Sequence, residues 1–334
     1  MDRNQEHPFA PFIRTLGRGR RGQRDLTLDE AHTAMALILD GQVEAVQLGA
    51  FLMLMRLKEE TPEEVAGMVA AARERLPSAA KAPNGALDWP SYAGKRRRPP
   101  WFILAQCLLA DAGHPVLVHG RPGLDRDRCY THEAYRRLGL PLADDLDEAS
   151  ALLGARGLCY LPLERFAPSL DALFDLRPLL GLRSPVNTLA RLLNPLGLPS
   201  IEGIFHPGFA RIHQGAAALL GDTVAVFRGE GGEGEIRPDT ETTLHLARDG
   251  ATETCPWPTL LPGRDARPAQ WSLADLCRLW HGGGDTYGEA AVISCAALGL
   301  FLAGAAPTPD EAVTRARDLW ARRDPRRIPE APRP

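Results

Sequence analysis

Short apolar runs that alternate with helix-length segments restrict the fold of this 334-residue chain more than any other feature. Val116–Val118 and Leu158–Leu161 are apolar throughout. Trp101–Ala112 precedes the first run with the length of a helix, and His132–Leu138 lies between the two runs. Short, fully apolar strands connected through helices are typical of a parallel sheet that is covered on both faces. We therefore expect a mostly parallel central sheet flanked by helices, an α/β fold.

Two later segments and the first part of the chain complete this expectation. Thr223–Phe227 and Thr242–Leu246 are rich in β-branched residues and predict further strands. Thr27–Glu30 and Thr61–Glu64 have the residues of capping boxes, so each predicts the start of a helix. Leu48–Leu57 is apolar nearly all round, which indicates a helix buried among neighbours. These helices predict a separate all-helical domain.

Composition and charge exclude several classes. The net charge is −3, so a binding site for a polyanion has to be local. The longest apolar stretches fall short of the roughly 20 residues of a membrane span, and Met1–Glu6 lacks the apolar core of a secretory signal. We expect a cytoplasmic protein without membrane contact. The six cysteines form no Cys-x-x-Cys pair, which favours reduced thiols over a zinc site.

Two segments concentrate positive charge. Lys95–Arg98 is the strongest basic run, and Arg14–Arg24 has five arginines with glycines and no acid. A solvated loop and a disordered tail are the ordinary interpretations of such segments. Contact with a phosphodiester backbone is the functional one.

Several segments resemble anthranilate phosphoribosyltransferase and the related nucleoside phosphorylase-type glycosyltransferases. Leu48–Thr61 is similar to the dimerising helices of that family, and Asp175–Leu189 with Leu193–Leu196 is similar to its long interlobe motif. The resemblance extends from about Leu26 to Ala321. It implies a helical dimerisation domain and a phosphoribosyltransferase-like α/β domain with a cleft between them.

The chain is accordingly divided as follows. Residues 1–25 are expected to form a flexible basic arm, and residues 77–90 a linker. Residues 26–76 with about 168–198 form the helical dimerisation domain, and residues 91–167 and 199–334 the α/β domain.

The sequence departs from the family where the resemblance implies chemistry. Active members bind pyrophosphate through the backbone of a glycine-threonine-glycine-glycine-aspartate loop. The corresponding segment of this chain is Tyr92–Arg98, in which Gly94 is the only glycine. The adjacent aspartate and glutamate that hold magnesium are replaced by Arg228–Glu235, in which glycines separate the acids. His119–Gly123 replaces another phosphate-facing loop. Arg177 lies where the family binds the carboxylate of its aromatic acceptor.

This pattern is most similar to the YbiB subgroup, whose members bind nucleic acid without evident sequence preference. The resemblance implies a cytoplasmic homodimer that binds nucleic acid, with DNA as the first candidate, needs no cofactor and has lost the transferase activity. Gly94 and Arg177 belong to the former substrate pocket. The predicted phosphate contacts are Lys95, Arg96, Arg97, Arg98, Arg18, Arg20, Arg21, Arg121 and Arg211.

Two other functions stay open. One is an active phosphoribosyltransferase with an altered acceptor, in which Glu233 and Glu235 would hold Mg²⁺. The other is a regulatory scaffold that binds a protein through its helical domain. Trp89, Tyr92 and Trp101 flank the basic loop and could stack on bases, although burial in the core is the more frequent position of tryptophan.

Overall fold

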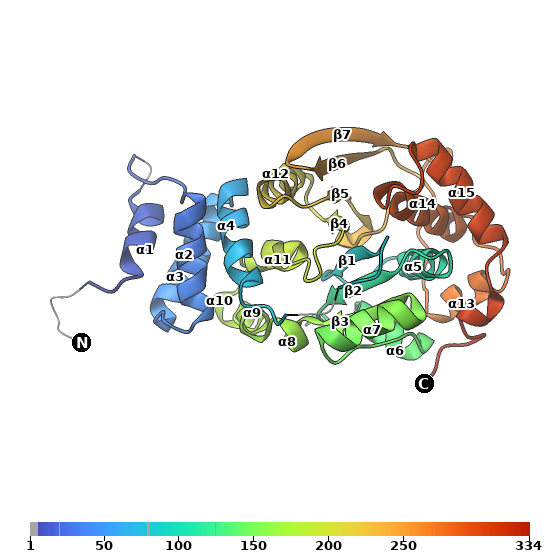
Figure 1. Ribbon diagram of the computed structural model, residues 1–334, viewed down its shortest axis with the longest axis horizontal. Coiled ribbons are helices and arrows are strands. Elements are labelled where there is room, and N and C mark those ends of the chain that lie inside the picture. The colour runs from blue at the N-terminus through green and yellow to red at the C-terminus, as the bar shows by residue number, and fades with distance from the viewer. Residues whose placement is uncertain (1–5, 20, 79–80, 124) are drawn as a thin grey trace.

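The computed structural model describes residues 6–19, 21–78, 81–123 and 125–334. Its chain forms a helical lobe and an α/β lobe that lie side by side, with the N-terminus at the helical end (Figure 1). This arrangement confirms the predicted fold class, an α/β fold with separate N-terminal helices.

The helical lobe is built around α1 (Ala10–Gly17), α2 (Leu28–Leu39), α3 (Ala45–Lys58) and α4 (Pro62–Arg73). Both predicted capping boxes are present at the starts of α2 and α4. In each, the threonine side chain accepts from the backbone N–H of the glutamate three residues later. Short helices from the middle of the chain pack with this lobe: α9 (Pro168–Phe174), α10 (Arg177–Leu180) and α11 (Val186–Leu189).

The central sheet has seven strands in the order β3-β2-β1-β4-β5-β6-β7. Strands β1 to β5 are parallel, and β6 and β7 add an antiparallel edge. Their bounds are β1 Leu87–Ser91, β2 Val116–Gly120, β3 Leu158–Pro162, β4 Ser200–Ile204, β5 Val224–Arg228, β6 Thr242–Arg248 and β7 Ala251–Trp257.

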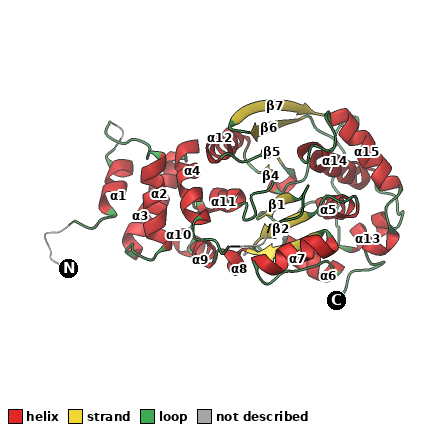
Figure 2. Cartoon of the chain, viewed as in Figure 1, coloured by secondary structure: helices red, strands yellow, loops and turns green. Residues whose placement is uncertain are grey.

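Helices cover both faces of this sheet (Figure 2). Val116 and Val118 belong to one apolar core and Leu117 to the other, which explains why the strand is apolar at every position. The first face packs against α5 (Phe102–Asp111), α6 (Thr131–Leu138), α13 (Ala274–Trp280), α14 (Thr286–Leu302) and α15 (Pro309–Ala321). The second face packs against α7 (Leu146–Arg156), α8 (Leu163–Phe166), α12 (Ala210–Leu220) and the helical lobe.

Two segments differ from the expectation drawn from sequence. Strand β1 begins inside the predicted linker, at Leu87, and is completely buried at the centre of the sheet. Its Asp88 and Pro90 disfavour a strand, but Asp88 Oδ2 accepts a hydrogen bond from Ser200 Oγ at 2.7 Å, and Asp88 Oδ1 lies 3.3 Å from His119 Nε2. The predicted flexible arm also contains α1, because Phe9 and Leu16 bury their side chains in the helical lobe. Within the described ranges, no helix has the length and apolar character needed to cross a membrane.

Candidate functional site

The loop after β1 presents backbone N–H groups that are already bound to a carboxylate of the same chain. Glu233 Oε1 accepts hydrogen bonds from the N–H groups of Ala93, at 2.7 Å, and of Gly94. Its second oxygen, Oε2, accepts from Ser91 Oγ at 2.8 Å. The resemblance implies that this loop faces pyrophosphate in active members of the family. Here an internal carboxylate occupies the anion-binding backbone.

Glycines hold the segment that carries Glu233 in place. A Cβ atom on Gly229 would lie 1.7 Å from the carbonyl oxygen of Glu233, and one on Gly234 would lie 2.4 Å from Trp89 Nε1. Gly94 has a φ of +69°, and a Cβ atom there would lie 2.8 Å from the Tyr130 ring. Both loops therefore need glycine, because a side chain at these positions would clash with the neighbouring segment. These glycines fix the backbone that carries Glu233.

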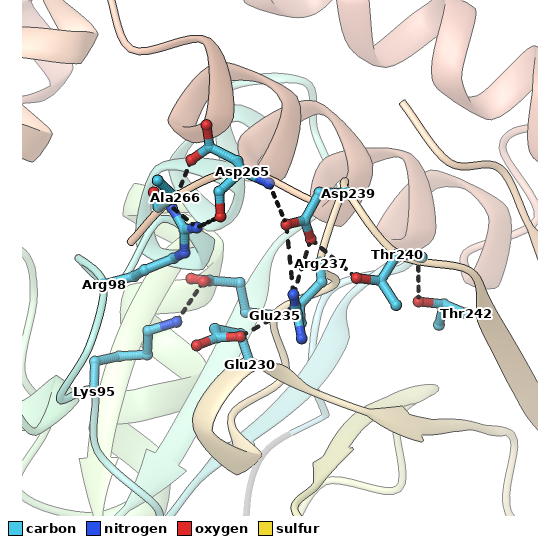
Figure 3. Close-up of polar contacts among 10 residues, drawn as sticks. All are labelled: Lys95, Arg98, Glu230, Glu235, Arg237, Asp239, Thr240, Thr242, Asp265 and Ala266. Carbon is cyan, nitrogen blue, oxygen red and sulfur yellow. Dashed lines mark hydrogen bonds and ion pairs between the residues drawn. The ribbon is translucent and has the colours of Figure 1, made fainter. Parts of the chain in front are cut away.

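The Lys95 side chain is buried in the α/β lobe. Its ammonium group forms an ion pair with Glu235, and the two side chains are 2% and 0% exposed (Figure 3). Glu235 also accepts from the backbone N–H of Phe102 at 3.0 Å. Burial raises the pKa of the Glu235 carboxyl, and the charge of Lys95 opposes that rise. Contact of Lys95 with phosphate stays a prediction, and in this structure the charge of Lys95 is already neutralised by this buried partner.

Arg98 is also an internal residue. Its guanidinium donates to Asp265 Oδ2 at 3.1 Å and to the Asp265 carbonyl at 2.9 Å (Figure 3). The same group lies 3.5 Å from the centroid of the Tyr287 ring. Arg98 thus fixes the segment after β7. Its contact with phosphate stays a prediction, and in this structure its charge is buried and paired.

Arg96 and Arg97, together with part of Lys95, line a cavity of about 200 Å³ at the carboxyl end of the sheet. Arg96 and Arg97 enter it from the loop after β1, Arg228 from the end of β5, and Arg267 from the segment after β7. We call this the arginine cavity. Arg96 pairs with Asp127 at 2.7 Å. Within the described part of the chain, Arg97, Arg228 and Arg267 have no hydrogen-bond or ion-pair partner, and all three are exposed.

Two further arginines in this cavity are partly neutralised. Arg128 donates to the carbonyls of Ala93 and Gly94 at 3.0 and 3.1 Å, so it also secures the loop that Glu233 occupies. Arg237 lies 3.4 Å from Glu230 and 3.3 Å from Asp239 (Figure 3). The positive charge that is free for a ligand therefore resides mainly on Arg97, Arg228 and Arg267.

The remaining predicted contacts are scattered. Arg121 is bound to Asp171 and Asp175, each at 2.8 Å, and lines a small cavity of about 40 Å³ together with Arg177. Arg211 is exposed on α12 outside both cavities. Arg18 and Arg21 are exposed near the end of the helical lobe, and Arg20 lies outside the described residues. The structure does not gather these positions into one site.

The aromatic side chains near the basic loop are not available for stacking. Trp89, Trp101 and Tyr92 are 0%, 1% and 9% exposed. Phe205, which follows β4, is instead 56% exposed and lines the arginine cavity. Sequence reasoning missed Phe205 together with Arg128, Arg228 and Arg267, since these residues come from separate segments that only the fold brings together.

The two acids that were considered for magnesium do not fit that ion. Glu233 is bound to two backbone N–H groups and a hydroxyl, and Glu235 to an ammonium and an N–H. A magnesium site needs oxygen ligands that are free to coordinate. In the described ranges no group of three or more His, Cys, Asp or Glu side chains has a metal-binding arrangement.

The two lobes and the order of strands are those of the anthranilate phosphoribosyltransferase fold. Residues 10–76 match the helical bundle domain of the glycosyl transferase family. Anthranilate phosphoribosyltransferase of Methylobacterium nodulans is 30% identical over 92% of this chain and 93% of its own. The chain therefore belongs to the anthranilate phosphoribosyltransferase family, as the resemblance implied.

Other relatives agree with this placement. The uncharacterized protein YbiB of Escherichia coli is 27% identical over 71% of this chain and 76% of its own. The structure of anthranilate phosphoribosyltransferase from Thermus thermophilus superposes with a TM-score of 0.77 at 23% identity, covering 95% of each chain. That likeness concerns the fold.

Proposed function

We propose that this protein binds nucleic acid, DNA in the first instance, through the arginine cavity, and that it does not transfer phosphoribosyl groups. One observation carries the proposal. Arg97, Arg228 and Arg267 converge on one cavity without internal partners, while the backbone donors beside them are occupied by Glu233. The cavity thus offers mobile side-chain charge to a phosphate and no free backbone cradle. Side-chain charge of this kind suits sequence-independent contact with a phosphodiester backbone.

The mechanism is electrostatic. Each arginine that neutralises a phosphate releases condensed counterions, and the logarithm of affinity then falls by about 0.7 per logarithmic unit of salt for single strands and about 0.9 for duplexes. Three arginines should give a slope between about −2 and −3. A homodimer would place two such cavities on one assembly and steepen the dependence.

Fluorescence anisotropy tests the proposal directly. Labelled single- and double-stranded DNA and RNA of equal length are titrated with the full chain at several salt concentrations. The proposal expects binding of strands of any sequence at low salt, with a slope within that range. No binding of any strand at low salt would rule it out.

An active phosphoribosyltransferase is the second candidate. Its support is the 30% identity to the Methylobacterium nodulans enzyme over nearly the whole chain. A relative from Saccharomyces cerevisiae has been solved in complex with PRPP and Mg, at 15% identity and a TM-score of 0.72. Against it stands the carboxylate of Glu233, which would repel a diphosphate from the loop after β1.

An assay for pyrophosphate release from phosphoribosyl pyrophosphate, with and without magnesium and anthranilate, separates the two functions. Magnesium-dependent release above a control without protein would favour the enzyme. The nucleic-acid proposal expects none.

A further inference from the structure

We propose that a pocket beside the arginine cavity binds a guanine base of the bound strand, so that the protein prefers single strands that contain guanine. The inference rests on the proposed nucleic-acid function and adds a base preference to it. The pocket has a volume of about 120 Å³ and lies where the end of α3 faces α11 and the loop between β4 and α12. We call it the interlobe pocket.

Glu60 supplies the first reason. This residue lines the interlobe pocket, is only 4% exposed, and its Oε2 has no hydrogen-bond partner in the described structure. An unpaired buried acceptor is costly, and a ligand with N–H donors would satisfy it. The ligand is therefore expected to present a donor to Glu60.

His213 lines the same pocket. Its Nδ1 lies 2.6 Å from Glu202 Oε2. A carboxylate oxygen accepts, so Nδ1 carries the hydrogen and this bond fixes the orientation of the ring. The Glu60 carboxylate therefore forms the wall of the pocket that accepts hydrogen bonds.

Guanine matches this wall better than the other bases. Its Watson–Crick edge places two neighbouring donors, N1–H and the N2 amine, side by side. Adenine and cytosine offer one amine beside an acceptor, and thymine one N–H between two carbonyls. A carboxylate, which can accept from both donors, thus favours guanine.

The position of the pocket ties the base to the phosphates. Phe205 lines both the interlobe pocket and the arginine cavity, and its ring is 56% exposed. A base can stack on such a ring while the adjoining phosphate reaches the arginines. Arg56, Arg183 and Arg191 also line the interlobe pocket, which disfavours a cationic ligand and suits a nucleotide.

The test compares two single-stranded DNAs of ten nucleotides. One contains thymidine only, and the other has a guanosine in place of one central thymidine. We expect the guanosine to raise the affinity of the wild-type chain about fivefold or more, the range of a well-formed bidentate contact. Glu60→Gln should bring the ratio of the two affinities close to one. Glu63→Gln, an exposed change three residues away, should retain the wild-type ratio.

A change in the ligand tests the same contact in the unaltered protein. Inosine lacks the N2 amine, so a strand with a central inosine should bind more weakly than the guanosine strand. Phe205→Ala should weaken binding of all strands relative to Leu219→Ala, a matched loss of an exposed apolar side chain on α12.

The outcomes distinguish the two proposals. Equal affinity of the wild-type chain for all three strands, or a guanine preference that persists in Glu60→Gln, would overturn the base pocket and leave nucleic-acid binding intact. Absence of binding to every strand at low salt would overturn both.

Discussion

Lys95 and Glu235 form an ion pair enclosed in the α/β lobe, far from each other in sequence and almost without solvent contact. Removing one member of a buried pair leaves an uncompensated charge, which costs about 3–5 kcal/mol. We therefore expect Lys95→Met to lower the free energy of unfolding by that amount, measured by chemical denaturation. Arg97→Met, a loss of an exposed unpaired charge two residues away, should change it by less than about 0.5 kcal/mol. Equal effects of the two substitutions would show that Lys95 is not the internal residue described.

Glu233 leads to a prediction about anions. Glu233→Ala frees the N–H groups of Ala93 and Gly94 and the hydroxyl of Ser91, and unsatisfied buried donors cost about 1–3 kcal/mol each. The variant should be destabilised, and pyrophosphate or sulfate should raise its melting temperature more than that of the wild type. Glu241→Ala, on an exposed residue, is the control, with chloride at matched ionic strength. An equal shift in all three proteins would contradict the assignment of this loop as an occupied anion site.

Glu60 makes stability depend on pH. Burial raises the pKa of its carboxyl above the usual value, while the charges of Arg56 and His213 oppose the rise and that of Glu64 adds to it. A raised pKa means that the folded state binds more protons than the unfolded state, so this contribution to stability is present at low pH and lost as pH rises through the folded pKa. Glu60→Gln cannot ionise. Its stability relative to the wild type should therefore improve as the pH rises above about 4, as measured by urea denaturation. A difference that does not change with pH would contradict this account of Glu60.

The helical lobe carries large apolar side chains that are exposed in the single chain. Val46 and Leu57 on α3 are 79% and 85% exposed, and their separation of eleven residues places them on the same side of the helix. Leu179 on the neighbouring α10 is 83% exposed. We expect a homodimer through this face. Light scattering after size-exclusion chromatography should give a dimer for the wild type and a monomer for Leu57→Glu with Leu179→Glu. A dimer that survives both charges would place the interface elsewhere.

Much of the fold could be predicted from the sequence, because capping boxes and apolar runs are local signals. Thr27 and Thr61 start helices as predicted, and Val116–Val118 and Leu158–Leu161 are buried strands. Strand β1 was missed because Asp88 and Pro90 are unfavourable locally, and only the neighbouring strands β2 and β4 make it a central strand.

The site was predicted less well, since pairing between distant residues decides which charges are free. The basic run at 95–98 was recognised. Whether Lys95 and Arg98 are free or paired depends on Glu235 and Asp265, which lie about 140 and 170 residues further on. Arg228 and Arg267 give no local sign of their role. Their meeting at the carboxyl end of the sheet follows from the parallel order of the strands.

The most direct test of the central claim is the salt dependence of oligonucleotide binding by a variant without the free charges of the arginine cavity. Arg97, Arg228 and Arg267 are replaced together by alanine, and Lys81, Arg156 and Arg248 in a control that removes three exposed charges elsewhere. We predict that the cavity variant loses about ten-fold or more in affinity at low salt and that its slope falls by about two or more, while the control stays close to the wild type. Equal losses in the two variants, or a wild-type slope without the cavity arginines, would contradict the claim that this cavity holds the nucleic-acid backbone.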